Sequence, residues 1–288
     1  MKRCLSCDAT FSGSSWSCPE CAWSPSENGV TTFAPALLSS SDHFPRDDVR
    51  RLSDLEEAHF WFAARNELIL WAISSYFPQA RTLLEVGCGT GIVLSRIRTG
   101  LPELHLTGAD LLHVALDVAR TRVPDADFAQ VDIRHLPYVE EFDIVCALDV
   151  LEHIDEDAAA LEQIAHALRP GGGVVISVPQ HMWLWSAADE YGRHRRRYSR
   201  RTLLRQLDEA GFDTMRATSS VSFLLPIVAI SRFRHRRLSD TYDPFREFGL
   251  PHGVNRLLKW VMSAERRLIR SGVSLPVGSS LTVVARKR

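Results

Sequence analysis

Between residues 82 and 178 the chain repeats one pattern, in which a short apolar run is followed by a longer segment with apolar residues at helical spacing. Short apolar runs that end at turn residues are typical of strands buried on both faces, and the longer segments are typical of helices that pack by one side. Such alternation predicts a parallel sheet covered by helices on both faces. The expected elements are strand 82–86, helix 91–98, strand 104–109, helix 112–121, strand 127–131, strand 142–148, helix 156–168 and strand 173–178.

Further elements are expected before and after this region. Apolar and aromatic residues recur at helical spacing from Leu55 to Tyr76, and Ser53 followed by Glu56 predicts the N-terminal cap of that helix. Downstream we expect a helix at 200–210, paired strands at 212–219 and 281–285, and between these strands an insertion over about 221–277 with a helix at 254–270. The apolar side of helix 254–270 fits a surface helix packed on the domain, which we favour, or an element at a membrane interface.

Four of the six cysteines lie in the first 25 residues, as two Cys-x-x-Cys pairs ten residues apart, namely Cys4, Cys7, Cys18 and Cys21. Two such pairs offer four thiolates to one tetrahedral zinc ion, and zinc would supply the folding free energy that so small a segment lacks. We therefore expect a structural zinc ribbon at residues 1–25, a linker rich in Ser and Pro at 26–48, and one large domain at 49–288. With four thiolates the metal has no open position for catalysis.

Composition bounds the class of protein. The 288 residues are 45% hydrophobic and 24% charged, which is typical of a globular chain with a substantial core. The net charge of −1 hides a split, because residues 1–180 carry 13 Lys and Arg against 26 Asp and Glu, whereas 181–288 carry 21 against 9. The basic third would meet an anionic partner, or the two parts attract each other within the fold. Neither a signal peptide nor an apolar run that could cross a bilayer is visible, so we expect a cytoplasmic protein.

A glycine-rich turn follows the first strand of the sheet. Glu85 and Val86 lead into Gly87-Cys88-Gly89-Thr90-Gly91. Glycine permits a tight turn there and lets a ligand approach the backbone closely. The turn lacks the third glycine of a dinucleotide-binding fingerprint, because Ile92 occupies that position.

With Glu85 before this turn and Asp110 after the next strand, the segment resembles the first motif of class I S-adenosylmethionine-dependent methyltransferases. The resemblance implies an α/β Rossmann-like fold with a seven-stranded, mainly parallel sheet whose last strand is antiparallel, and S-adenosylmethionine as methyl donor. Residues 59–66 resemble the helix before the donor site in a bacterial methyltransferase-23/11-like subgroup, which makes Trp61 and Arg65 further contact candidates. The alternative is an ordinary strand-turn-helix with no ligand.

The same resemblance implies roles for residues at the strand ends. Asp110 would accept hydrogen bonds from the ribose of the donor. Asp132 would meet the adenine amine, with Ile133 against the base, and Asp149 would orient the ligand. The implied donor-binding set is Glu85, Gly87, Cys88, Gly89, Gly91, Asp110, Leu111, Asp132, Ile133 and Asp149.

The segment after the fifth strand is the most informative about the acceptor. Six of the nine residues from 193 to 201 are Arg. Arginine binds phosphate and carboxylate in bidentate geometry, and aromatic residues beside it suit a ligand with an anionic group and an apolar part. The alternative is a solvated charged loop. The candidate acceptor-binding residues are Trp183, Trp185, Arg193, Arg195, Arg196, Arg197 and Tyr198.

Methyl transfer needs aligned reactants, and a base where the acceptor is a hydroxyl. By topology we expect His153 to be the base, then His194, although either is as readily structural. No Asn/Asp-Pro-Pro-aromatic tetrad follows the fourth strand and no Pro-Cys pair follows the fifth. These absences disfavour amino methylation of a nucleobase and methylation at a pyrimidine carbon.

The sequence therefore favours a methyltransferase that acts on a small or carrier-linked metabolite, by O-methylation of a hydroxylated, anionic acceptor. One alternative is an RNA methyltransferase guided by the zinc ribbon, although the ribbon between Cys4 and Cys21 holds Asp8 and Glu20 and no Lys or Arg. Another is a non-catalytic zinc-ribbon interaction protein on a methyltransferase-like fold. A peripheral membrane or lipid contact stays open as a further partner.

Overall fold

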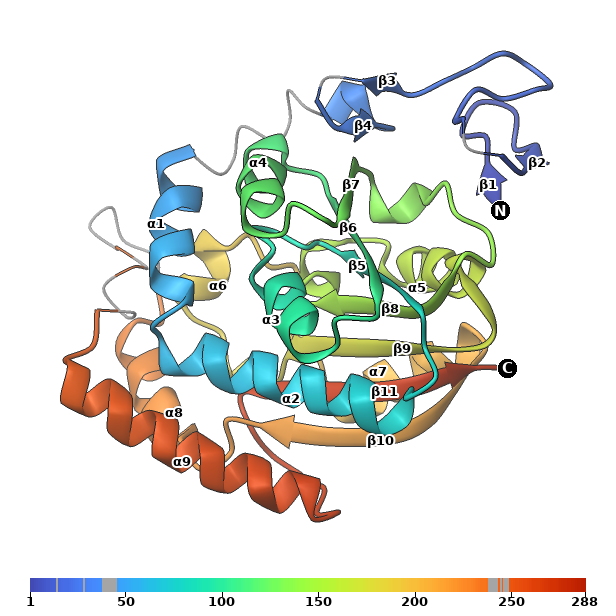
Figure 1. Cartoon of the computed structure of the whole chain (residues 1–288). Coiled ribbons are helices and arrows are strands. Elements are labelled where there is room, and N and C mark those ends of the chain that lie inside the picture. Colours follow the sequence, from blue (N-terminus) through green and yellow to red (C-terminus); the bar gives the residue numbers. More distant parts are fainter. Residues whose placement is uncertain (14, 28, 38–45, 238–242, 244, 246–248) are drawn as a thin grey trace.

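A single mixed sheet runs through the centre of the molecule (Figure 1), in a computed structural model that describes residues 1–13, 15–27, 29–37, 46–237, 243, 245 and 249–288. Its nine strands have the order β10-β11-β9-β8-β5-β6-β7-β4-β3. Strands β5 to β9 are mutually parallel, and β11 lies antiparallel between β9 and β10. The strands are β3 (Ser26–Glu27), β4 (Thr31–Thr32), β5 (Thr82–Val86), β6 (His105–Asp110), β7 (Asp127–Gln130), β8 (Phe142–Leu148), β9 (Leu168–Pro179), β10 (Phe212–Ser220) and β11 (Ser280–Lys287).

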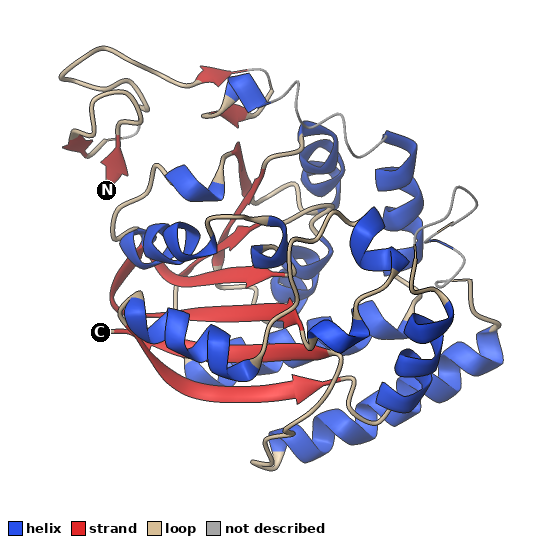
Figure 2. Cartoon of the chain, turned by 180° about the vertical axis from the view of Figure 1, so that it is seen from behind, coloured by secondary structure: helices blue, strands red, loops and turns tan. Residues whose placement is uncertain are grey.

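Helices cover both faces of this sheet, as the opposite views of Figures 1 and 2 show. One buried cluster joins the sheet to α2, α3 and α4, and a second joins the other face to α5 and α7. The described helices are α1 (Arg46–Glu56), α2 (Phe60–Tyr76), α3 (Ile92–Gly100), α4 (His113–Arg122), α5 (Asp157–Ala167), α6 (Ala187–Tyr191), α7 (Arg200–Glu209), α8 (Leu225–Arg234) and α9 (His252–Arg270), with short 3-10 turns η1 (Pro35–Leu37), η2 (Ile133–His135), η3 (Leu151–His153) and η4 (Met182–Leu184). In these described parts, no helix combines the length and the apolar character needed to cross a membrane.

The predicted alternation of strands and helices is confirmed. From residue 82 onwards, the expected helices and all expected strands but one begin within two residues of their predicted positions. The exception is β9, which begins at Leu168 rather than at residue 173, because Leu168 pairs with Phe142 before the register shifts. The seven-stranded sheet is present as β5 to β11, and two short strands extend it at the β7 edge.

The expected helix start at Ser53 is wrong. Helix α1 begins at Arg46 and ends at Glu56, and α2 begins at Phe60, where the side chain of His59 accepts the N–H of Trp61 at 3.3 Å. The hydroxyl of Ser53 instead accepts a hydrogen bond from Arg122 at 2.9 Å. Ser53 therefore makes a tertiary contact, although the sequence around it is typical of a helix cap.

The expected linker is only partly a linker. Thr31 and Thr32 pair in parallel with Ala129 and Gln130 of β7, so this segment becomes part of the main sheet. Phe33 packs edge-on against Trp16 of the N-terminal segment, with ring centroids 4.6 Å apart. β-branched and aromatic residues in this stretch favour strand structure, which its Ser and Pro content obscured. Positions 38–45 of the expected linker lie outside the described residues.

Candidate functional site

A cavity of about 270 Å³ opens at the carboxyl ends of the parallel strands β5, β6, β7 and β8. This is where doubly wound sheets bind their ligands. Most of its wall is apolar, and three carboxylates enter it from different strand ends. The lining residues are Val86, Gly87, Ala109, Asp110, Leu111, Leu112, Val131, Asp132, Ile133, Leu136, Asp149, Val150, His153 and Ile154.

The glycine turn contributes Gly87 to the wall of this cavity. Gly87, Gly89 and Gly91 all have positive φ, at 69°, 52° and 74°, which is a backbone conformation that side chains disfavour. A Cβ atom at Gly87 would lie 2.2 Å from Val150, so the close approach of these two segments requires glycine. Both Gly87 and Cys88 donate their N–H to the carbonyl of Ala109, which fixes the turn against β6.

Asp110 presents its carboxylate to the cavity from the end of β6. One oxygen accepts the N–H of Gly89 at 2.8 Å and the other accepts the N–H of Leu112 at 2.9 Å. Burial raises the pKa of Asp110, and these backbone hydrogen bonds oppose that rise. Each carboxylate oxygen has a second lone pair, so the group can still accept two hydroxyl donors from a ligand.

Asp132 lines the same cavity, but its carboxylate has a partner that the sequence did not suggest. Arg134 donates to both oxygens, with its Nη2 at 2.8 Å and its Nε at about 3.0 Å. Although burial opposes it, this guanidinium lowers the pKa of Asp132, which therefore stays charged. A ligand amine would have to share the carboxylate with Arg134, while Ile133 lies on the cavity wall as expected.

Asp149 lies at the end of β8 with a positive φ of 57°. Its carboxylate accepts from Arg65 of α2 at 2.6 Å, and the Arg65 guanidinium lies over the ring of Trp61, 4.8 Å from the centroid. Helix α2 therefore reaches the site through Arg65, as the resemblance of residues 59–66 suggested. The same Asp149 faces the cavity, where its free lone pairs suit a cationic ligand group.

Comparison with known proteins decides the family. A family model described as a methyltransferase domain matches residues 52–217. The chain belongs to this family. The structures that it resembles confirm the fold: phosphoethanolamine N-methyltransferase 2 of Haemonchus contortus has a TM-score of 0.56 at 16% identity and covers 86% of this chain and 58% of that chain. A methyltransferase of Thermotoga maritima has a TM-score of 0.52 at 15% identity, over 85% and 97% of the two chains.

Curated relatives match the methyltransferase domain in part. A ubiquinone biosynthesis O-methyltransferase of Aromatoleum aromaticum is 29% identical over 147 residues, 45% of this chain and 61% of that protein. A probable S-adenosylmethionine-dependent methyltransferase of Mycolicibacterium smegmatis is 26% identical over 175 residues, 59% and 65% of the two chains. A malonyl-[acyl-carrier protein] O-methyltransferase of Haemophilus ducreyi is 31% identical over 100 residues, 33% and 39%. The chain thus spans between about two fifths and two thirds of the length of these relatives.

Four residues that were predicted to bind the methyl donor do not line the cavity. They are Glu85, Cys88, Gly89 and Gly91. Glu85 is 2% exposed, burial raises its pKa to about 8 against the attraction of Arg65, and its Oε2 has no partner among the described residues.

The glycine turn is also held in place by hydrogen bonds that the sequence did not reveal. Thr90 donates to Glu56 of α1, and Arg122 donates to the same carboxylate at 3.1 Å.

Two of the loop arginines are not free to bind an anionic group of the acceptor, as the sequence suggested they would be. Arg197 is buried and binds Asp189 with its Nε at 2.7 Å and its Nη2 at 3.1 Å. Arg196 pairs with Asp157 at 2.9 Å, and Tyr198 donates to the same carboxylate at 2.7 Å. The contact of Arg196 with Asp157 joins the basic third to an acid of the earlier part, in line with the second explanation of the charge split, whereas the pair of Arg197 and Asp189 lies within the basic third.

The remaining acceptor candidates lie outside these buried pairs. Arg195 forms an exposed pair with Asp155 at 3.4 Å. Arg193 is exposed, and no carboxylate pairs with it in the described part of the chain. Trp183 is 45% exposed and stacks between the rings of His181 and Phe233. Neither it nor Trp185 lines the cavity.

The structure brings the two candidate bases together. His153 lines the cavity, and its ring centroid lies 4.7 Å from that of His194. His153 is exposed, but the packing around its ring and the neighbouring His194 lower its pKa to about 4. Nδ1 of His194 lies 3.0 Å from Asp189. Burial would raise the pKa of Asp189, but the hydrogen bond with His194 and the charge of Arg197 lower it to about 2.

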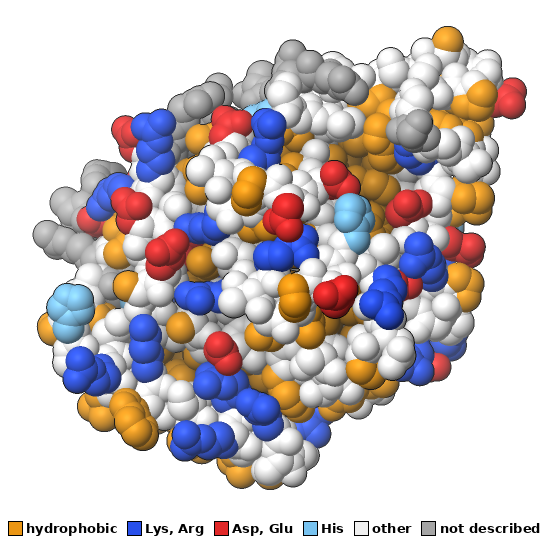
Figure 3. Space-filling view, viewed as in Figure 1, with side chains coloured by type: hydrophobic (Ala, Val, Ile, Leu, Met, Phe, Trp, Pro, Cys, Tyr) orange, Lys and Arg blue, Asp and Glu red, His pale blue; other side chains and the backbone are white. Residues whose placement is uncertain are grey.

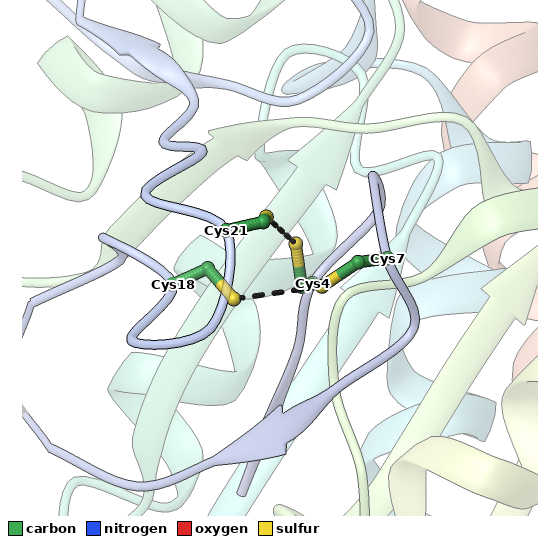
Figure 4. A group of neighbouring side chains, drawn as sticks. All are labelled: Cys4, Cys7, Cys18 and Cys21. Atoms are coloured by element: carbon green, nitrogen blue, oxygen red, sulfur yellow. Dashed lines mark hydrogen bonds between the residues drawn. The ribbon is translucent and has the colours of Figure 1, made fainter.

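The four N-terminal cysteines converge, as Figure 4 shows. They come from two loops beside the hairpin of β1 (Lys2–Arg3) and β2 (Thr10–Phe11). Sγ atoms lie 3.6 Å apart for Cys4 and Cys21 and 3.7 Å apart for Cys7 and Cys18, and none is in a disulfide. Thiolates about 2.3 Å from one zinc ion lie roughly 3.8 Å from each other in a tetrahedron. The cluster therefore fits a structural zinc ion with no open position.

Helices α8 and α9 carry an exposed apolar surface outside the cavity. Helix α9 packs on the domain by Met262, Glu265 and Ile269. Its expected apolar side is therefore only partly buried, because Leu257 is 63% exposed. Apolar side chains nevertheless remain exposed on the two helices, among Lys and Arg side chains that gather over α9 in Figure 3. They are Phe223 beside α8, Ile227, Ile230 and Phe233 on it, and Val254, Leu257 and Trp260 on α9.

Proposed function

We propose that the protein is an S-adenosylmethionine-dependent methyltransferase that methylates a hydroxyl group of a small or carrier-linked metabolite. The observation that carries this proposal is the carboxylate of Asp110, held by two backbone N–H groups at the edge of a largely apolar cavity. The named activities of the curated relatives, two of them O-methyltransferases, support the same reaction class.

The residues of the cavity fit the parts of the donor. Asp110 would accept the two ribose hydroxyls, and Ile133 and Leu112 would lie against the adenine ring. The carboxylate of Asp149, already oriented by Arg65, would attract the ammonium of the amino acid end. When bound, the donor supplies a methyl group activated by its sulfonium. The chain then needs to hold donor and acceptor in line and exclude water.

The acceptor enters on the side of His153, which faces the cavity from the turn after β8. A neutral imidazole there can accept the proton of a hydroxyl group. The anionic group that we expect on the acceptor would meet Arg193, because Arg196 and Arg197 are engaged with Asp157 and Asp189.

The zinc ribbon is proposed as a structural module held by Cys4, Cys7, Cys18 and Cys21. Binding of a nucleic acid is not favoured, because the ribbon loops carry Asp8 and Glu20, and because Arg196 and Arg197 are paired with acids of the domain. An RNA substrate would bind with a steep dependence on salt, which a filter-binding assay at two salt concentrations measures. The glycine turn and the cavity support donor binding rather than a purely non-catalytic module.

The proposal is tested by calorimetry with S-adenosylhomocysteine, the demethylated donor. We expect the native chain to bind it and the Asp110→Ala variant to lose at least ~100-fold in affinity, because two charge-assisted hydrogen bonds are removed. Asp117→Ala, an exposed acid on α4 away from the cavity wall, is the matched control. Absence of heat with native protein, or unchanged affinity in Asp110→Ala, would contradict the proposal.

A further inference from the structure

Three potential metal ligands converge beside the donor cavity. Glu152, His153 and His194 each offer one ligand atom, and these three atoms lie within 4.8 Å of one another. Glu152 and His153 belong to η3, and His194 belongs to the loop between α6 and α7. The N–H of Arg195 donates to the carbonyl of Glu152 at 2.7 Å, so the two segments are fastened together beside the three side chains.

Glu152 is the unexplained member of this group. It is 1% exposed, and neither of its carboxylate oxygens has a hydrogen-bonding partner among the described residues. The two nearby guanidiniums are engaged elsewhere, since Arg197 binds Asp189 and Arg65 binds Asp149. A carboxylate without a partner is costly to bury, and protonation alone would still leave its two oxygens without hydrogen bonds.

The two histidines are oriented from behind, as metal-binding histidines are. Nδ1 of His194 pairs with Asp189 at 3.0 Å, which leaves Nε2 as its free ligand atom. The ring of His153 has the backbone of Gly192 as a hydrogen-bonding partner. A carboxylate or a carbonyl behind the ring fixes the tautomer and the direction of the remaining nitrogen.

We infer that Glu152, His153 and His194 form a binding site for a divalent transition-metal ion at the acceptor side of the cavity. Two imidazoles and one carboxylate suit zinc, manganese or iron(II), and three ligands on one side of the ion leave positions open for other oxygen atoms. Ligand atoms about 2.1 Å from one ion lie roughly 3.0–3.4 Å apart. The site therefore closes by small side-chain rotations when it binds the ion.

This site gives the reaction its acceptor specificity, a role that rests on the proposed function. With His153 bound to the ion rather than acting as the base, the acceptor hydroxyl oxygen would coordinate the ion, which would favour loss of its proton to water. The resulting oxyanion forms a bond to the methyl carbon, the bond from that carbon to sulfur breaks, and the electron pair stays on sulfur. One methyl ether, one neutral thioether and one proton result. The inferred substrate class is therefore metal-coordinating hydroxyl compounds.

Titration of the full chain with Mn²⁺, followed by the electron paramagnetic resonance signal of the free ion, tests the site. Manganese suits carboxylate and imidazole ligands and avoids the thiolate cluster. We expect one Mn²⁺ per chain, and at least a ~10-fold weaker affinity in Glu152→Gln and in His194→Ala. His166→Ala, on the exposed side of α5, is the matched control and should bind as the native chain does.

Zinc content provides a second measurement that does not depend on manganese. Protein loaded with zinc should hold two equivalents, falling to one in Glu152→Gln and to one in Cys7→Ser, which removes a thiolate of the other site. Retention of both zinc equivalents in Glu152→Gln, or a native chain that binds no Mn²⁺ and only one zinc, overturns the inference. Glu152→Gln is nearly isosteric, and its melting temperature, compared with that of the native apoprotein, reports whether it folds.

Calorimetry with S-adenosylhomocysteine on the same samples separates the two proposals. Donor binding without a metal at Glu152 would overturn the metal site and leave the proposed function intact. A metal bound at Glu152 without donor binding would overturn the proposed function, and with it the role in acceptor activation, while the metal site itself would stand.

Discussion

The donor side and the acceptor side of the cavity are built in different ways. On the donor side, the backbone positions the chemistry: three glycines with positive φ bring the turn against Val150, and two N–H groups hold Asp110. On the acceptor side, side chains position other side chains, as Asp189 does for Arg197 and His194. A backbone-built site can be recognised from a short motif, whereas a site built from ion pairs depends on segments that meet only in the fold.

The largest expected effect tests whether the loop arginines are structural. Arg197→Ala leaves Asp189 buried without its guanidinium partner, and we expect it to lower the free energy of unfolding by about 3 kcal/mol. Arg195→Ala, in the same loop but in an exposed pair, should cost less than ~1 kcal/mol. Urea unfolding of both variants measures the difference. Equal effects would show that burial of the pair does not matter.

The pH dependence of stability is a second test of the buried pair that Asp189 forms with Arg197. The pKa of Asp189 falls from 3.8 to about 2 on folding. A group with a lowered pKa in the folded state adds stability above its unfolded value, here about 2 kcal/mol, and this contribution is lost as the pH falls from about 4 towards 2. Urea unfolding at pH 3, 5 and 7 measures it. In Asp189→Asn this part of the acid sensitivity should vanish, and an unchanged acid profile would contradict the assignment.

A steric test addresses the donor side. In Gly87→Ala the positive φ alone costs about 1–2 kcal/mol, and the new Cβ would meet Val150 at 2.2 Å. We expect lower stability and weaker binding of S-adenosylhomocysteine by calorimetry. Adding Val150→Ala should recover the part due to the contact but not the part due to φ. If the double variant is no better than the single one, the close approach is not the constraint.

The smallest effect concerns the exposed apolar side chains of α8 and α9. Together with Arg234 and Arg236 they form a surface suited to an anionic membrane, where each basic residue near the surface contributes about 1 kcal/mol. We expect weak co-sedimentation with phosphatidylglycerol liposomes at low salt, reduced in Leu257→Gln/Trp260→Gln, which removes two exposed side chains. Val139→Thr, a change away from these helices, is the control. No binding at low salt would remove the membrane contact.

The order of strands and helices was predictable because most strands of the parallel sheet are short, largely apolar runs that end at a turn. That Asp110, Asp132 and Asp149 line one cavity was predictable because parallel strands bring their carboxyl ends to one edge. Ser53 misled because its cap-like sequence serves a tertiary contact with Arg122. Local sequence does not record such a contact.

The loop arginines and Glu152 were not predictable from the sequence for a related reason. Six arginines in nine residues look like an open cationic surface until the fold places Asp155, Asp157 and Asp189 against them. That the Glu152 carboxylate lacks a hydrogen-bonding partner among the described residues depends on how Arg65 and Arg197 are engaged, which the sequence does not show.

The pairing of Thr31 and Thr32 with β7 has a consequence for how the sheet ends. A bare outer strand offers unpaired amides to any neighbouring molecule and invites self-association. The short hairpin of β3 and β4 occupies that border, and the aromatic contact of Phe33 with Trp16 links it to the cysteine-bearing loops. We therefore expect the N-terminal segment to limit association at this edge of the sheet, and a zinc ion held by its cysteines would stabilise that cover without contacting the donor cavity.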